Sequence, residues 1–151
     1  NKRHFQKKVE EEVLRAEDFG AELSLVHFAI DGTEEHIHRL GNEGFENLLH
    51  RVAGILRSSI HPYDVMGRTD ATRLSVLLVN MAASDAYLWA EKVCKQIAST
   101  VFAIDGESCV VTLSAGVCGL TEGMGAEELT AGALQVLHKA IESGGNLVRV
   151  F

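Results

Sequence analysis

Residues 64–80, DVMGRTDATRLSVLLVN, are the stretch that decides the fold of this chain. They predict two short strands, at residues 64–68 and 74–80, joined by a tight turn. The turn contains the sequence DATRL at residues 70–74. We therefore expect a hairpin, with the elements on either side of it packed against its strands.

Two helices and one strand are predicted before this hairpin. Apolar residues at helical spacing within residues 5–16 predict a first helix that ends at Gly20. Residues 21–30, AELSLVHFAI, predict a strand that is largely apolar on both faces, which places it at the centre of a sheet. The apolar stripe within residues 45–56 predicts a helix that continues to about Ile60.

A third helix and a long strand are predicted after the hairpin. Ser84 or Asp85 can cap the helix, and its buried stripe is expected to run from Ala86 to Val101. Residues 109–120, CVVTLSAGVCGL, predict one long strand whose two faces are both apolar or small.

The chain is predicted to close with a helix at residues 129–141, ended by the glycine pair 144–145, and a strand at residues 147–151. The order of elements contains a β-α-β-β-α-β core, which is typical of ferredoxin-like folds. We therefore predict the α+β class, with a central, mostly antiparallel sheet of about five strands flanked by helices.

Composition limits the function classes. A length of 151 residues with 46% hydrophobic and 23% charged residues fits a single globular domain, residues 1–151, and its polar start suggests a domain cut from a longer protein. The net charge of −7 argues against non-specific nucleic-acid binding, which needs a basic face.

No apolar run approaches the roughly 20 residues of a membrane span. Cys94, Cys109 and Cys118 lack metal-site spacing and predict buried thiols in a reducing cytoplasm.

Several short motifs occur in one register along the whole chain. The chain begins with NKRHF, Asp31 ends the first predicted strand, and Arg68 precedes the hairpin turn. Residues 111–117, VTLSAGV, form the most specific segment, and Ala140, Gly144 and Asn146 follow it. These motifs resemble those of GGDEF domains, the diguanylate cyclase family that condenses two GTP molecules into cyclic di-GMP. The resemblance implies the palm fold of nucleotide cyclases.

The cation-binding positions implied by this resemblance have changed. Phosphoryl transfer in such a site needs two divalent cations held by carboxylates. The first carboxylate of the family falls on Ala29, and only the second, Asp31, remains; an aspartate at that point is more often structural. The acidic pair of the signature falls on Thr72 and Arg73, so a guanidinium stands where a cation would bind.

The nucleotide-binding positions implied by the resemblance have also changed. The paired glycines of the signature fall on Asp70 and Ala71, whose side chains obstruct the close approach of a nucleotide. Of the guanine-reading positions, Ile37 and Glu46, only Glu46 could still accept hydrogen bonds from a guanine edge. The three cationic phosphate ligands of the family fall on Glu34, Ile141 and Gly145.

A second ligand site is open to two interpretations. The inhibitory product site of the family has the pattern Arg-x-x-Asp, and here His61-Pro62-Tyr63-Asp64 occupies it, with Lys92 on the next helix as a supporting cation. Histidine lacks the bidentate fork of arginine and is mostly neutral at pH 7. Cyclic di-GMP binding at His61, Asp64 and Lys92 is one interpretation. The other is that His61 and Asp64 cap and solvate a loop.

The residues together predict a catalytically inactive, regulatory GGDEF-like domain of bacterial cyclic di-GMP signalling, located in the cytoplasm. No cofactor is expected, because the Mg²⁺ site is predicted to be lost. The alternatives are a cyclic di-GMP or GTP receptor and, with least support, an active cyclase. Candidate partners are a second copy of the chain, a sensor or phosphodiesterase domain of the same polypeptide, and cyclic di-GMP.

Overall fold

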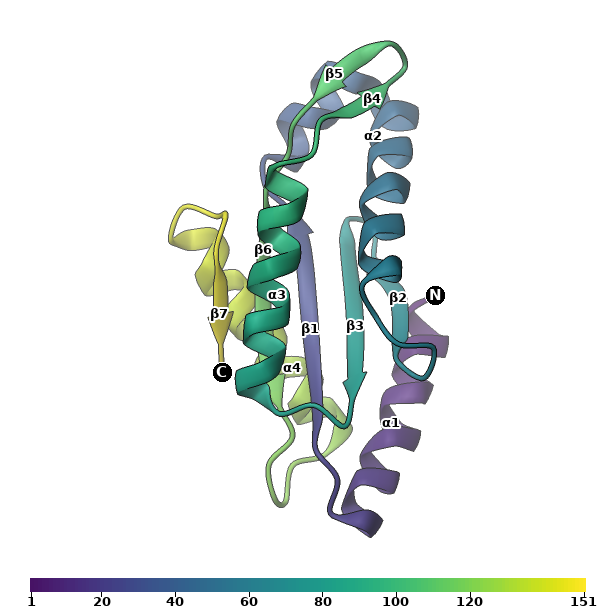
Figure 1. The fold of residues 1–151 in the computed structure, drawn as a ribbon, viewed down its shortest axis with the longest axis vertical. Coiled ribbons are helices and arrows are strands. Elements are labelled where there is room, and N and C mark those ends of the chain that lie inside the picture. Colours follow the sequence, from purple (N-terminus) through teal and green to yellow (C-terminus); the bar gives the residue numbers. More distant parts are fainter.

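A five-stranded sheet with helices on both faces forms the centre of the computed structural model, which describes residues 1–151 (Figure 1). The elements in chain order are α1 (Lys2–Phe19), β1 (Leu23–Ile30), α2 (Thr33–Ser58), β2 (Val65–Asp70), β3 (Arg73–Val79), α3 (Ala83–Ala98), β4 (Phe102–Ile104), β5 (Glu107–Cys109), β6 (Leu113–Gly119), α4 (Ala126–Glu142) and β7 (Val148–Val150). The strand order of the sheet is β2-β3-β1-β6-β7. All pairs are antiparallel except β6 and β7, so the predicted fold class is confirmed.

Both faces of the sheet are buried, which explains the apolar character of β1. Successive residues of a strand point to opposite faces. Val26 and its partner Val76 belong to the core cluster formed with α2 and α3, whereas Leu25 and its partner Leu77 belong to the cluster formed with α1 and α4. The prediction that β1 lies at the centre of the sheet is therefore confirmed.

The hairpin and the first helix are also confirmed. β2 and β3 pair antiparallel, with Ala71 and Thr72 at the tip and an irregularity at Thr69. α1 ends at Gly20, whose φ of 63° is the left-handed conformation that glycine adopts at little cost.

Three predictions about the helices are wrong in detail. α2 begins at Thr33, and its first part, before a break at Gly41 (φ 78°), was not predicted because few apolar residues mark it. α3 has Ala82 at its N-cap position without a side-chain hydrogen bond, so neither Ser84 nor Asp85 caps it; both lie inside the first turn. Val101 lies beyond α3 and is 64% exposed.

The predicted long strand at residues 109–120 is two strands. β5 ends at Cys109 and β6 begins at Leu113, and β5 pairs with β4 in a separate hairpin that was not predicted. The turn of this hairpin is Asp105-Gly106, both with positive φ. An Asp-Gly pair that follows a short apolar segment, here Phe102–Ile104, is a hairpin signal, so the sequence did contain the information.

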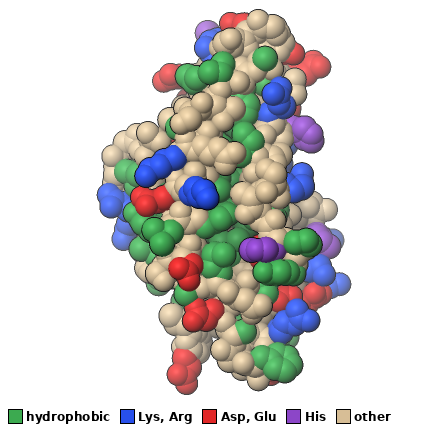
Figure 2. Space-filling model, in the orientation of Figure 1, with side chains coloured by type: hydrophobic (Ala, Val, Ile, Leu, Met, Phe, Trp, Pro, Cys, Tyr) green, Lys and Arg blue, Asp and Glu red, His purple; other side chains and the backbone are tan.

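Cys94, Cys109 and Cys118 are free and buried, as predicted, and burial raises the pKa of the Cys94 thiol to about 12 and that of Cys118 to about 11. None of the helices combines the length and the apolar character needed to cross a membrane. Figure 2 shows Lys, Arg and His side chains along the side of the molecule that α2 forms in Figure 1.

Candidate functional site: the tip of the hairpin and the end of β1

The end of β1 and the tip of the β2–β3 hairpin lie together. Ala29 pairs with Arg73 of β3 on one side and with Ser114 of β6 on the other. A surface hollow of about 410 Å³ is lined by the end of β1, the start of α2, Thr72 and Ile141. The predicted positions that line this hollow are Ala29, Asp31, Glu34, Thr72 and Ile141.

Asp31 ties three segments together through its carboxylate. Its Oδ1 accepts a hydrogen bond of 2.6 Å from the Ser114 hydroxyl, and its Oδ2 accepts bonds of 2.7 Å from the Thr112 hydroxyl and 2.8 Å from the Asn146 amide. Gly145 packs so closely that a Cβ there would lie 2.6 Å from Oδ1. The carboxylate thus joins β1 to β6 and to the turn between α4 and β7.

Arg73 is also held by neighbouring side chains. Its Nε donates a 3.0 Å hydrogen bond to the Thr69 hydroxyl, and its Nη1 lies 3.7 Å from Oδ2 of Asp70. The Arg73 side chain is only 18% exposed. Its positive charge is therefore held against β2, on a residue where the resemblance implies a carboxylate.

A buried network of hydrogen-bonded side chains continues from Arg73 to α4. The Thr69 and Ser75 hydroxyls lie 2.7 Å apart, Ser75 lies 2.6 Å from Nδ1 of His27, and Nε2 of His27 lies 3.2 Å from the carbonyl oxygen of Thr130. A carbonyl can only accept, so Nε2 carries the proton and Nδ1 accepts from Ser75. The hydroxyl of Thr69 then donates to Ser75 and accepts from Arg73. Every side chain of this network has a hydrogen-bond partner.

Burial is the main reason that the pKa of His27 is lowered to about 4, and the charge of Arg73 lowers it further. His27 is therefore neutral near pH 7. This hydrogen-bonded network was not predicted from the sequence. The signal was a histidine within the otherwise apolar β1, opposite Ser75 in the sheet register.

Glu46 is paired with Arg68. The Arg68 guanidinium donates bonds of 2.8 and 2.6 Å to the two carboxylate oxygens of Glu46, and its Nε donates a 3.0 Å bond to the Ala71 carbonyl. The hydrogen bonds from Arg68 lower the pKa of the Glu46 carboxyl. This pair joins α2 to the tip of the hairpin. Ile37 packs against the core and does not line the hollow at the end of β1.

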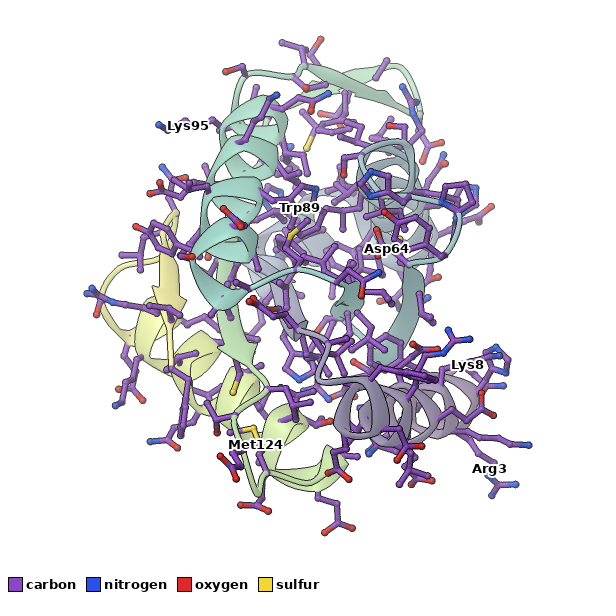
Figure 3. The ribbon with its side chains drawn as sticks, turned by 60° about the horizontal axis from the view of Figure 1, so that its bottom comes forward. Arg3, Lys8, Asp64, Trp89, Lys95 and Met124 are labelled. Carbon is purple, nitrogen blue, oxygen red and sulfur yellow. The ribbon has the colours of Figure 1, made fainter.

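The loop before β2 contains the other predicted site. The Asp64 side chain is 1% exposed and accepts 2.9 Å bonds from the His61 and Val79 amides, while the exposed His61 ring stacks on Tyr63. Figure 3 shows Asp64 pointing into the body of the molecule, between α2 and the sheet. Lys92 is exposed on α3 and forms no hydrogen bond or ion pair with His61 or Asp64. These contacts are those of the loop-capping interpretation, and ligand binding stays a prediction.

The sheet order, the hairpin beside the end of the central strand and the helices on both faces define the palm-like α+β class of nucleotide cyclases. Residues 1–147 match the sequence profile of the family described as "Diguanylate cyclase, GGDEF domain". The chain therefore belongs to the GGDEF domain family. No curated protein matches this sequence.

Solved GGDEF domains have the same fold. The GGDEF domain of DgcB from Caulobacter crescentus, in complex with c-di-GMP, superposes with a TM-score of 0.94 at 18% identity, over 99% of this chain and 90% of that one. The FimX GGDEF domain from Pseudomonas aeruginosa gives 0.93 at 23% identity, over 98% and 92%. The active GGEEF domain of a diguanylate cyclase from Vibrio cholerae gives 0.92 at 22% identity, over 100% and 96%. At these identities the similarity shows the shared fold.

Proposed function

We propose that this chain is a catalytically inactive GGDEF domain that acts as a regulatory or interaction module in bacterial cyclic di-GMP signalling, in the cytoplasm. The observation that supports it most is the replacement of the cation-binding charges at the end of β1. Ala29 supplies no ligand, and Arg73, its partner in the sheet register, carries a guanidinium that Thr69 and Asp70 of β2 hold. The remaining carboxylate, Asp31, accepts three hydrogen bonds from the protein itself.

This set of side chains does not fit Mg²⁺. The ion requires near-octahedral oxygen ligands and is usually held by one or two carboxylates. Here a Mg²⁺ ion would have to displace the hydroxyl and amide donors from Asp31, and the residues at positions 29, 72 and 73 supply no second carboxylate. We therefore derive no step that uses a metal ion.

The size of the rate contributions made by catalytic residues supports the absence of turnover. A single arginine that stabilises the transition state of phosphoryl transfer can contribute roughly 10³–10⁵ in rate. This domain lacks the family's cationic phosphate ligands at Glu34, Ile141 and Gly145 in addition to the acidic ones. Even when such losses are strongly non-additive, the remaining rate is negligible.

The direct test is an assay of the purified domain with GTP and either Mg²⁺ or Mn²⁺, in which cyclic di-GMP is separated by chromatography. The active GGEEF domain from Vibrio cholerae, prepared and assayed in parallel, is the positive control. We expect no product above the level without protein. Metal-dependent formation of cyclic di-GMP by this chain would refute the proposal.

A second candidate function is that of a cyclic di-GMP or GTP receptor. Two observations support it: Asp64 occupies the aspartate position of the inhibitory site, and the exposed His61 and Tyr63 rings stack beside it. Rings exposed in this way can stack on a nucleobase. Calorimetric titration with cyclic di-GMP, and separately with GTP, tests this function. Saturable heat that is lost in the variant His61→Ala would support the receptor function. No heat with either nucleotide would exclude the receptor function, and the interaction module would remain as the proposed function.

The partners of an interaction module are then other proteins or protein domains. A second copy of this chain, or a sensor or phosphodiesterase domain of the same polypeptide, is the partner that we propose. Sedimentation velocity over a range of concentrations tests the first, because self-association follows mass action. A sedimentation coefficient that rises with concentration would support a homodimer.

A further inference from the structure

A hollow between α2 and the edge strand β2 borders the candidate site at Glu46 and Arg68, and its other lining residues have no role in the function proposed above. Its volume is about 200 Å³. Leu49 and Ala53 of α2, Met66 of β2 and Leu74 of β3 form its apolar floor. Thr72, Arg73 and Asp31, which lie around the hairpin tip and the end of β1, do not line it.

The rim of this hollow is basic. His50, Arg57 and Arg68 line it, and the one acidic residue at the rim, Glu46, is already neutralised by Arg68. Arg57 and His50 are exposed and take part in none of the ion pairs of the structure. Figure 2 shows such basic and His side chains along the α2 side. The molecule as a whole has a net charge of −7, so this basic rim is a local exception.

The geometry of α2 explains the shape of the hollow. Residues 46, 50, 53 and 57 recur at intervals of three or four, so they lie on one face of the helix. At about 1.5 Å per residue, the stripe extends roughly 16 Å, from the Glu46–Arg68 pair to Arg57. The apolar floor lies between these two ends, and the free cation is at the end remote from the hairpin tip.

We propose that this hollow binds a small amphipathic anion, with one aromatic ring or a short aliphatic chain on the floor and a carboxylate or phosphate monoester at Arg57. An apolar cavity of ~150 Å³ accommodates benzene, so a ring and its head group fit the available volume. A guanidinium binds either head group through two parallel hydrogen bonds. His50 supplies a further donor on the same helix face.

Benzoate and phenyl phosphate are the probes. Each is titrated into ¹⁵N-labelled domain at constant ionic strength, and amide chemical shifts are followed. We expect saturable shifts confined to residues 49–57 and 66–68, with a dissociation constant of about 1–10 mM for the better probe. The stronger of the two probes identifies the preferred head group. Saturable binding by neither probe overturns the proposal.

Two partial probes test whether both halves of the hollow act. Benzyl alcohol has the ring without the charge, and inorganic phosphate has the charge without the ring. We expect each to bind at least roughly fivefold more weakly than the better probe, because hydrogen bonds to a charged group and burial of apolar surface both contribute. Equal binding of inorganic phosphate would overturn the proposal, since the floor would then contribute nothing.

Three variants complete the test. Arg57→Gln should weaken binding about tenfold, because the bidentate pair is lost. Lys95→Gln removes one charge from an exposed position on α3, shown pointing outward in Figure 3, and should leave binding unchanged. Ala53→Leu should fill the floor and abolish binding, with retained amide dispersion as the check on folding. Equal loss in Arg57→Gln and Lys95→Gln would show a non-specific charge effect and refute the site.

Discussion

Asp31 and Asp64 lie at opposite ends of the sheet, yet both carboxylates are used in the same way. Asp31 follows β1 and accepts bonds from Ser114, Thr112 and the Asn146 amide. Asp64 precedes β2 and accepts bonds from the His61 and Val79 amides. Each carboxylate joins segments that are distant along the chain. In each region, the acidic residue of the family pattern that remains is one that the fold itself uses.

The two aspartates are retained, whereas the residues around them differ from the family pattern. Near Asp31, Ala29 and Thr72 line the hollow as small side chains, and Arg73 reverses the charge. Near Asp64, a histidine stands at the arginine position. Side chains whose role was to contact a ligand can change without loss of stability, whereas a carboxylate with several protein donors cannot. We infer that structural bonds account for both retained aspartates.

The largest effect is expected from Asp31→Ala. It leaves the Thr112 and Ser114 hydroxyls and the Asn146 amide without their acceptor, and should lower the free energy of unfolding by about 3–4 kcal/mol. Glu34→Ala, in the same hollow but exposed and without a bond, should change it by less than about 0.5 kcal/mol. Urea denaturation measures both. Equal effects would contradict a structural role for Asp31.

Acidification should destabilise the domain through His27. Its pKa is about 4 in the folded protein and near 6.5 when unfolded, so between these values the unfolded state binds more protons. Stability from this group is complete above about pH 6.5 and is lost as the pH falls towards 4, by up to about 3 kcal/mol. Urea denaturation at a series of pH values measures the slope, which should be shallower in His27→Gln. An unchanged slope in that variant would assign the acid sensitivity to other groups.

Whether a feature of the fold or of the site could be predicted depends on how far apart along the chain the residues that form it lie. Apolar periodicity predicted β1, the hairpin and the buried faces of the helices, because local spacing determines which side chains face the sheet. The bonds to Asp31 come from residues 81, 83 and 115 positions away, so no local pattern contained them. Prediction of the hydrogen-bonded network from Arg73 to His27 would have required the strand register that places His27 opposite Ser75. By contrast, the β4–β5 hairpin had a local signal at Asp105-Gly106 that was not used.

Asp64→Ala should have a smaller effect than Asp31→Ala, because it removes the acceptor of two amides instead of three donors. We expect a loss of about 2 kcal/mol in the free energy of unfolding, measured by urea denaturation. Asp64→Asn keeps one oxygen acceptor and should lose about half as much. If Asp64→Ala were neutral, the capping role of Asp64 would be wrong and its retention would favour the receptor function.

The smallest effect is expected from restoring the acidic pair. The double variant Thr72→Asp with Arg73→Glu returns two carboxylates to the hairpin tip, but Ala29 and the missing phosphate ligands remain. We expect no cyclic di-GMP from GTP and Mg²⁺, measured by chromatography, and a loss of stability of about 1 kcal/mol because Thr69 loses its Arg73 donor. Turnover in this variant would show that the charge reversal alone prevents catalysis.

The most direct test of the lost cation site is a titration of ¹⁵N-labelled domain with Mn²⁺, whose unpaired electrons broaden the signals of nearby amides. A carboxylate that already accepts three hydrogen bonds from the protein, with no second carboxylate at positions 29, 72 and 73, should not hold the ion. We predict no saturable broadening below about 1 mM Mn²⁺, with or without GTP. Saturable broadening below that concentration, confined to Ile30, Asp31, Gly32 and Thr72, would contradict the account.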